Sequence, residues 1–220
     1  MGISSYHQGE LYTSYRLPLS ILGLREPCFE PAVFMSMENE NLQIATLGGG
    51  CFWCTEAVFE RLEGVHQVIS GYAGGHVVNP TYEEVCVKTT GHAEVTQVHF
   101  DAEVISYEEL LEIFWASHDP TTKDRQGNDR GPQYRSVIYY HDLAQKNAAE
   151  LSAEQVATTM YQDPIVTEIE ALDVFYPAEA YHQDFYRLNP NYGYCRVIID
   201  PKVAKVRAKY AERLKEEYRV

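Results

Sequence analysis

Strand-like and helix-like segments alternate along most of this chain, and that alternation limits the folds it can adopt. From residue 94 to residue 100, apolar side chains recur with a period of two, which is the spacing of a half-buried strand. Soon afterwards, Ser106 and Glu109 have the spacing of a capping box and predict the start of a helix. The buried face of that helix is expected to hold Leu110, Leu111, Phe114 and Trp115.

The other expected elements continue this alternation. Strands are predicted at residues 43–47, 65–72, 136–140 and 165–175, with a short apolar run at 195–199. Helices are predicted after residue 51, from Asp142 to about Ala157, and from Asp200 onward. Because some strands are joined by helices and others by turns, we expect an α+β two-layer sandwich. Its helices would pack on a mixed sheet with a ferredoxin-like core, followed by a C-terminal helix.

The first predicted helix has a two-sided pattern. Its inner face is expected to hold Val58, Phe59 and Leu62. Its outer face is expected to hold Glu56, Glu60 and Arg61. Such a division is typical of a helix with one side on a core.

The length of 220 residues suits one folded domain with tails. Residues 1–40 have no sustained period of either kind, so we expect a flexible, irregular N-terminal extension. Residues 41–220 are then expected to form the single folded domain, which carries any activity.

Charge and hydropathy exclude several classes of protein. The formal net charge of −14 argues against a nucleic-acid groove, because phosphate binding needs clustered Lys and Arg. No apolar run approaches the roughly 20 residues of a membrane helix. The apolar stretch at residues 17–24 lacks the flanks of a secretory signal. We therefore expect a cytoplasmic protein that binds neither nucleic acid nor membranes. We also expect a monomer, although neither charge nor hydropathy fixes the oligomeric state.

The cysteine count indicates reactive or metal-binding thiols. An odd number of cysteines in an acidic chain of this length is not typical of a disulfide scaffold. The five cysteines are Cys28, Cys51, Cys54, Cys86 and Cys195.

The segment Gly48-Gly49-Gly50-Cys51-Phe52-Trp53-Cys54 is the strongest local signal. A cysteine after a glycine turn, at the first residue of a helix, faces unpaired backbone N–H groups and the positive end of the helix dipole. Both favour the thiolate, so the pattern predicts a lowered pKa and a nucleophilic Cys51. The alternative is a buried cysteine beside a core Phe-Trp pair.

Cys51 and Cys54 are three residues apart and would share one helix face, as in a dithiol that closes into a disulfide. The same spacing is half of a zinc site, but no second close pair of Cys or His follows, so no metal is expected. A general dithiol oxidoreductase and a redox-sensing or metal-binding module remain alternatives.

Further motifs are weak singly and specific together. They are Asn79-Pro80-Thr81-Tyr82-Glu83-Glu84-Val85-Cys86, Thr90-Gly91-His92-Ala93-Glu94, Arg125-Gln126-Gly127-Asn128-Asp129, Gln133-Tyr134-Arg135-Ser136 and Tyr181-His182-Gln183-Asp184-Phe185. With the Cys51 segment and Gly71-Tyr72-Ala73-Gly74-Gly75, this set resembles the peptide methionine sulfoxide reductases of type A, over roughly residues 44–207.

That resemblance implies an activity and a set of site residues. Cys51 would attack the sulfoxide sulfur and become a sulfenic acid, with Glu94 as the acid. Tyr82 and Tyr134 would donate hydrogen bonds to the sulfoxide oxygen, and Asp129 would orient the polar loop. Phe52 and Trp53 would form an apolar wall, edged by His182 and Tyr186.

The resemblance also implies how the enzyme is recycled. Cys54 and Cys195 are the two candidate resolving cysteines, and thioredoxin is the expected reductant. No cofactor is expected, because the electrons come from thiols. The substrates would be free methionine sulfoxide and oxidised proteins, whose methionine side chains the enzyme would repair.

Overall fold

The structure is a computed structural model that describes residues 41–219. The predicted N-terminal extension, residues 1–40, lies outside the described residues. The strands are β1 Leu42–Gly49, β2 Val65–Ala73, β3 Ala93–Asp101, β4 Arg125–Gln126, β5 Asp129–Arg130, β6 Ser136–Tyr140, β7 Glu168–Ala171 and β8 Phe175–Pro177. The α-helices are α1 Phe52–Phe59, α2 Tyr82–Cys86, α3 Tyr107–Ser117, α4 Leu143–Ser152, α5 Thr158–Met160, α6 Phe185–Leu188 and α7 Asp200–Tyr210.

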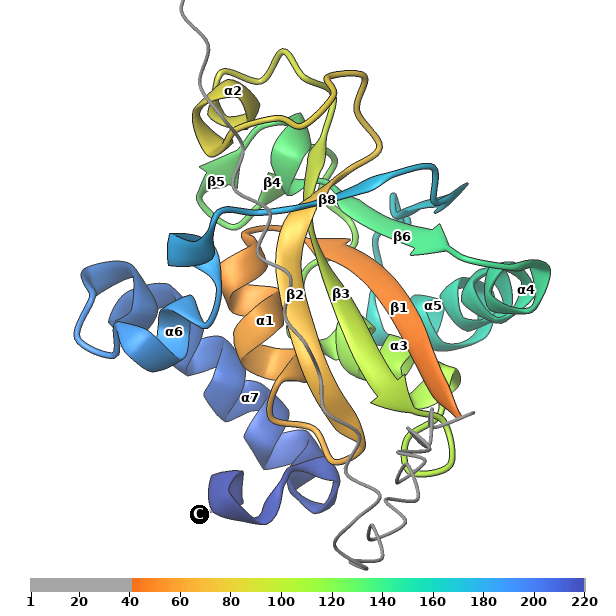
Figure 1. The fold of residues 1–220 in the computed structure, drawn as a ribbon. Coiled ribbons are helices and arrows are strands. Elements are labelled where there is room, and N and C mark those ends of the chain that lie inside the picture. Colours follow the sequence, from red (N-terminus) through yellow and green to blue (C-terminus); the bar gives the residue numbers. More distant parts are fainter. Residues whose placement is uncertain (1–40, 220) are drawn as a thin grey trace, which may run out of the picture. The chain divides into compact units, whose positions relative to one another are not determined.

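Six of the strands form one mixed sheet in the order β7-β6-β1-β3-β2-β8 (Figure 1). The pairs β1·β3, β2·β3, β1·β6 and β2·β8 are antiparallel, whereas β6 and β7 are parallel. The central strand β3 pairs Val98 with Ala45 on one side and with Val68 on the other. The predicted mixed α+β sheet packed by helices is confirmed.

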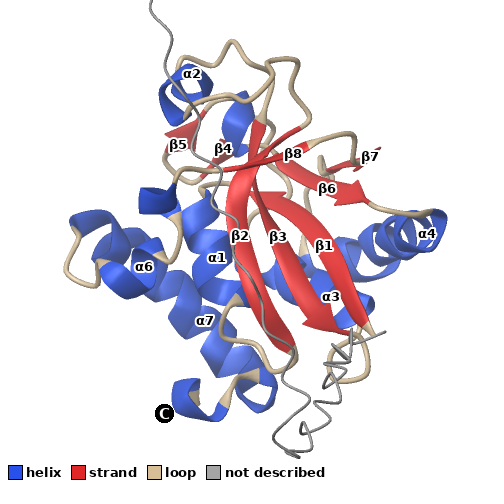
Figure 2. Ribbon diagram, viewed as in Figure 1, coloured by secondary structure: helices blue, strands red, loops and turns tan. Residues whose placement is uncertain are grey.

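Helices α1 and α3 pack against the sheet, and α7 packs against both helices (Figure 2). The core between them holds large apolar side chains that are almost fully buried, including Leu47, Phe59, Phe100, Phe114 and Trp115. Burial of each such side chain contributes about 1.5–3 kcal/mol to folding. This packing fixes the start of α1 against the sheet.

The predicted helix starts at Ser106 and Asp142 are confirmed. The Ser106 side chain accepts a hydrogen bond from the Glu109 N–H, and the Glu109 carboxylate accepts one from the Ser106 N–H, which is a complete capping box. Asp142 accepts a hydrogen bond from the Gln145 N–H in the same way. After α4 the chain continues as a π-helix over Ala153–Ala157 and then as α5, so this helical segment ends at Met160, three residues beyond the predicted end.

The predicted outer face of α1 is wrong at two positions, because Glu56 and Arg61 are buried. The C-terminal part of the chain covers the face of α1 that is turned away from the sheet. Glu56 accepts hydrogen bonds from the backbone N–H groups of Asp184 and Phe185, and Arg61 lies over the ring of Tyr186. Helical periodicity alone does not reveal this second covering layer.

The single strand predicted at residues 165–175 is wrong. The structure has two short strands there, and they lie on opposite edges of the sheet. Strand β7 runs parallel to β6, and Leu172 donates a hydrogen bond to the Tyr140 carbonyl before the chain leaves that edge. Strand β8 then pairs with β2 at Gly71–Ala73. A strand-like pattern does not tell where a chain changes its pairing partner.

The short apolar run at residues 195–199 is not a strand. Cys195–Ile199 forms a π-helix that continues into α7. Arg196 donates a backbone hydrogen bond to the Tyr192 carbonyl, so helical bonding begins before Cys195. The C-terminal helix is confirmed; it buries Val206 and Tyr210, and Leu214 just beyond it is buried too.

Candidate active site

A pocket of about 190 Å³ lies at the start of α1. Its lining residues come from the start of α1, from α2, β3 and β5, from the 3-10 helix Pro132–Tyr134 and from the segment before α7. They are Cys51, Phe52, Trp53, Tyr82, Glu94, Asp129, Tyr134, Tyr192 and Tyr194. All five residues predicted to perform chemistry therefore meet in one place.

The turn into α1 is tighter than predicted, because Gly48 and Gly49 continue strand β1 and pair with β6. Only Gly50 leaves the strand, with φ of +95°, a conformation that favours glycine. A side chain at Gly50 would meet Gln126 Cγ at 2.5 Å. The absence of a side chain thus lets the loop with β4 and β5 close over the start of the helix.

Cys51 is the N-cap residue of α1, and only 7% of its surface is exposed. The prediction of a lowered pKa is wrong for this structure. Burial raises the pKa of the Cys51 thiol well above its usual value, and a hydrogen bond with Cys54 raises it further. The first N–H of the helix does not stabilise a Cys51 thiolate, because Phe52 donates this N–H to the Glu94 carboxylate at 3.0 Å.

Glu94 lies in β3 and is 1% exposed. Burial raises the pKa of Glu94 to about 8, even though the hydrogen bond from the Phe52 N–H opposes the rise. The carboxyl group therefore carries a proton near neutral pH. A buried acid that holds its proton beside a thiol is suited to general acid catalysis.

Cys54 is buried one helical turn after Cys51, and the two thiols share a hydrogen bond. That hydrogen bond lowers the pKa of Cys54 to about 7, and the positive charge of Lys202 in α7 lowers it too. The Tyr194 hydroxyl lies 4.0 Å from the Cys54 sulfur. In this pair, Cys51 is the thiol that keeps its proton and Cys54 the one that loses it more readily.

Tyr82 and Tyr134 line the pocket from two different elements, the first residue of α2 and the 3-10 helix Pro132–Tyr134. The capping box of Thr81 with Glu84 starts α2, and Tyr82 donates its backbone N–H to Glu179. Burial raises the pKa of both tyrosines, so both hydroxyls stay protonated. Each is therefore available as a hydrogen-bond donor toward the pocket.

Tyr194 is a site residue that the sequence did not predict. Its hydroxyl donates a hydrogen bond of 2.6 Å to Asp129 and so joins the loop before α7 to strand β5. Tyr192 lines the same wall. A run of Asn, Pro, Gly and Tyr marks a loop but does not indicate which tyrosine faces a pocket.

Phe52 and Trp53 form the apolar side of the pocket as predicted. The Trp53 ring stacks on Phe185 of α6, with centroids 3.6 Å apart and an angle of 6°. Trp53 also donates its indole N–H to His182 Nδ1 at 3.2 Å. The orientation of Trp53 is thus fixed from two sides.

The two residues predicted to edge the pocket lie elsewhere. His182 is buried behind the pocket wall, where it packs on Phe52 and Tyr82 with ring centroids 5.1 Å and 4.4 Å away. Tyr186 lies farther off and donates its hydroxyl to Asp200. Neighbouring positions on α6 point in different directions, and it is Phe185 that reaches Trp53.

Cys195 is fully buried in the same apolar cluster as Cys51 and Cys54, but it does not line the pocket. Burial raises the pKa of its thiol. Cys86, at the end of α2, is partly buried, and all four cysteines of residues 41–219 are free thiols.

Neither metal binding nor a membrane span is indicated in the part of the chain that the structure describes. No group of three His, Cys, Asp or Glu side chains there is arranged to hold a metal ion. No helix among residues 41–219 is long and apolar enough to cross a membrane.

A buried cysteine, a second thiol within reach and a protonated carboxylic acid define a cysteine-dependent oxidoreductase. The family model for peptide methionine sulfoxide reductase matches residues 43–214. The chain therefore belongs to the peptide methionine sulfoxide reductase family, and it reduces methionine sulfoxide at the expense of thiols. Its activity is that of a peptide-methionine (S)-S-oxide reductase.

Individual relatives agree with this assignment. A protein named peptide methionine sulfoxide reductase MsrA, from Leptospira borgpetersenii serovar Hardjo-bovis, is 57% identical over 164 residues, which are 74% of this chain and 93% of the relative. Reduced Mxr1 from Saccharomyces cerevisiae matches with a TM-score of 0.64 and 35% identity, covering 70% of this chain and 90% of Mxr1. Methionine sulfoxide reductase A of Corynebacterium diphtheriae matches with a TM-score of 0.62 and 35% identity, covering 69% and 76%.

Proposed function

We propose that Cys51 is the nucleophile that reduces methionine S-sulfoxide. Its sulfur attacks the sulfoxide sulfur, so that an S–S bond forms as the sulfoxide S–O bond breaks. The oxygen then bonds to the Cys51 sulfur as the S–S bond breaks, which releases methionine and leaves a sulfenic acid on Cys51. The methionine sulfur gains two electrons and the Cys51 sulfur loses two. The hydrogen bond between Cys51 and Cys54 supports this step, because it gives the Cys51 proton an acceptor as the attack begins.

Glu94 is the acid of this reaction. The observation that carries the proposal is its place: a buried carboxyl group with a pKa of about 8, hydrogen-bonded to the residue that follows the nucleophile. Its proton goes to the sulfoxide oxygen, which makes the sulfur more electrophilic. Such a general acid commonly contributes about 10²–10⁴-fold to the rate.

The tyrosine hydroxyls of Tyr82 and Tyr134 donate hydrogen bonds to the same oxygen, on which negative charge grows as the S–O bond weakens. Asp129 orients the loop by accepting the hydrogen bond of Tyr194. On the opposite side, Phe52 and Trp53 receive the substrate methyl group. A polar side for the oxygen and an apolar side for the methyl group together favour one epimer at sulfur.

The sulfenic acid is removed by a second thiol. Cys54 attacks the Cys51 sulfenic sulfur, water leaves, and a disulfide forms. Its lowered pKa and its hydrogen bond with Cys51 support Cys54 as the first resolver. The Cys195 thiol then attacks the Cys51–Cys54 disulfide, forms a new disulfide with one of these cysteines and frees the other as a thiol. An external dithiol such as thioredoxin reduces the new disulfide and returns the enzyme to its reduced form. His182 supports the pocket wall by packing on Phe52 and Tyr82, and Tyr186 lies farther off, so neither contacts the substrate.

We also infer four features of the chain around this site. The connection β1-α1-β2-β3-α3-β6 with strand order β6-β1-β3-β2 supports a ferredoxin-like core in two layers. Residues 41–220 form the catalytic domain. The protein acts as a monomer. Its free thiols suit the reducing cytoplasm.

An assay of the separate sulfoxide epimers with dithiothreitol tests the proposed function. We expect the S epimer to be reduced and the R epimer to be left unchanged. A general dithiol oxidoreductase would instead reduce insulin disulfides and would not need Glu94. Reduction of both epimers at similar rates, or of insulin alone, would contradict the proposal.

A further inference from the structure

The outer edge of β2 is only partly paired. Strand β8 pairs with Gly71–Ala73, and just beyond it Ala178 donates its N–H to the Ser70 carbonyl. The Gln183 side chain then completes the pairing, because its amide accepts from the Ser70 N–H and donates to the Ser70 carbonyl, each at 2.9 Å. Among the described residues, pairing along this edge ends at Ser70.

Val68 lies two residues before Ser70 and opposite Val98 of β3. In an antiparallel strand, every second residue directs both its N–H and its C=O to the same side. The main-chain groups of Val68 therefore face the same open edge as those of Ser70. Neither group has a hydrogen-bond partner among residues 41–219.

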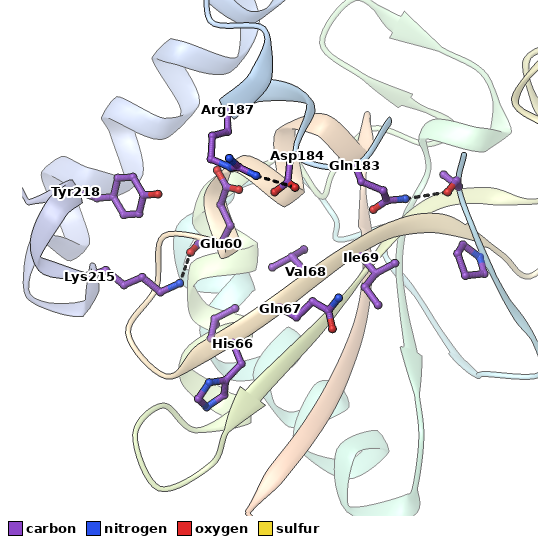
Figure 3. A pocket seen from close by; sticks show the side chains of 13 residues that line it. Glu60, His66, Gln67, Val68, Ile69, Gln183, Asp184, Arg187, Lys215 and Tyr218 are labelled. Carbon is purple, nitrogen blue, oxygen red and sulfur yellow. Dashed lines mark hydrogen bonds and ion pairs between the residues drawn. The ribbon is translucent and has the colours of Figure 1, made fainter. Parts of the chain in front are cut away.

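A groove of about 450 Å³ runs along this unpaired stretch (Figure 3). One side is β2 from residue 65 to residue 69, and the other is formed by Glu60, Arg187, Lys215 and Tyr218. It lies on a different part of the molecule from the catalytic pocket, and the two share no lining residue.

The charged side chains of the groove already have partners. Arg187 forms an ion pair with Asp184 at 2.8 Å, and Lys215 donates to the Glu60 carbonyl at 2.8 Å. Among residues 41–219, the polar groups left without partners in the groove include the main chain of Val68 and the exposed side chains of His66 and Gln67. A groove of this kind recognises the backbone of an extended peptide rather than particular side chains.

We propose that this edge binds the main chain of the polypeptide substrate as an added strand, at a distance from the methionine sulfoxide. The inference rests on the proposed function. The catalytic pocket, at about 190 Å³, receives a single side chain, so the flanking polypeptide must lie outside it. An enzyme that repairs methionine in many sequences needs contacts independent of sequence, and main-chain hydrogen bonds supply them.

The separation of groove and pocket suits one extended chain. Cys51 caps the start of α1 and Glu60 its end, nine residues later, which corresponds to about 14 Å along the helix. An extended chain covers about 3.3 Å per residue, so about four or five residues join the two sites. The segment from Ala178 to Gln183 links them, since both residues line the groove and His182 packs on Tyr82 at the pocket.

A scan of N-methylated substrates tests the proposal on the unaltered full chain. Each oxidised peptide carries one methionine S-sulfoxide and one N-methyl group, placed one to seven residues away on either side. An N-methyl group removes a donor and blocks strand pairing. We expect about a fivefold fall in kcat/KM at one position four or five residues from the sulfoxide, and little change at its neighbours. A flat scan would overturn the proposal.

A proline at the edge gives a second test. Val68→Pro removes the outward N–H, and proline is tolerated on edge strands where the N–H faces outward. We expect the ratio of kcat/KM for peptide to that for free methionine sulfoxide to fall about fivefold. Val68→Thr, which keeps the N–H, is expected to hold this ratio within twofold. If the unaltered chain did not reduce free methionine sulfoxide, that result would contradict the proposed function rather than the proposed peptide-binding edge.

Hydrogen exchange of the Val68 amide distinguishes the three segments that could pair with this edge: a substrate peptide, the chain's own N-terminal segment, or a second copy of the protein. We expect fast exchange in the free protein and slow exchange with an oxidised peptide bound. Slow exchange without peptide at every protein concentration would assign the edge to the chain's own N-terminal segment. Slow exchange that grows with protein concentration would assign it to a second copy. Either result would overturn the proposal.

Discussion

The carboxylate of Glu94 accepts a 3.0 Å hydrogen bond from the backbone N–H of Phe52, the residue that follows Cys51. This bond joins strand β3 to the first turn of α1, between residues 42 positions apart in the chain. It also takes the N–H that a thiolate at Cys51 would otherwise use. The cysteine is therefore activated by its partners during the reaction rather than by the helix start alone.

Replacing Glu94 with Gln tests its role as the acid. The amide keeps the shape of the side chain but has no proton to transfer, so we expect the single-turnover rate of methionine formation to fall by about 10²-fold or more. Substrate binding should change little. A single-turnover rate within threefold of the unaltered enzyme would show that Glu94 has only a structural role.

The same residue predicts a pH dependence. Because the pKa of Glu94 is raised to about 8, its proton is held below that pH and lost above it. We expect the single-turnover rate to fall as the pH rises through about 8. The Glu94→Gln enzyme, measured over the same range, should lack this fall, and its persistence there would assign it to another group.

The order of disulfide exchange is tested by peptide mapping after one equivalent of methionine S-sulfoxide, without reductant. We expect a Cys51–Cys54 disulfide first, because the Cys54 thiol already contacts Cys51 and has a pKa of about 7. A bond to Cys195 should follow more slowly, since Cys195 is buried and must move. Formation of a full Cys51–Cys195 bond at the normal rate in Cys54→Ser would exclude Cys54 as the first resolver.

Glu56 predicts a pH dependence of stability. Burial raises its pKa to about 7, whereas an unfolded glutamate titrates near about 4.3. The folded state therefore binds the Glu56 proton more tightly than the unfolded state does. The resulting contribution to the free energy of unfolding is fully present below about pH 4.3 and is lost as the pH rises to about 7.

We expect the melting temperature of Glu56→Gln to vary less between pH 5 and pH 8 than that of the unaltered protein. Glu103→Gln, which removes a charge from an exposed turn, is the control and should keep the normal slope. An unchanged slope in Glu56→Gln would show that Glu56 is ionised throughout this range.

Deletion of residues 1–36 tests the domain boundary. That segment has no periodic apolar face, so few buried contacts should be lost. A chain starting at Met37 should keep its melting temperature and its activity on free methionine sulfoxide. Aggregation, or a fall of several degrees, would mean that the segment packs on the domain.

Much of the fold and the site was predictable from local patterns. Ser106 with Glu109 marks a helix start through groups three residues apart, and such groups are visible in sequence. Cys51, Tyr82 and Glu94 lie in distinct short motifs of the family. The resemblance therefore predicted that they share one site, and all three line the same pocket.

The errors share a physical cause, which is contact between distant segments. The burial of Glu56 depends on Asp184 and Phe185, more than 120 positions away. The role of Tyr194 depends on Asp129, in a separate loop. The raised pKa of Cys51 depends on how deeply later segments bury it. Periodicity within one segment carries none of this information.

The most direct test of the account is to locate the oxygen after one turnover. In Cys54→Ser/Cys195→Ser, treated with one equivalent of methionine S-sulfoxide, we expect one methionine per enzyme and a mass gain of one oxygen atom on the peptide with Cys51. Cys51→Ser in the same background should give neither. Methionine formed without Cys51, or oxygen found on another residue, would contradict the assignment of Cys51 as the nucleophile.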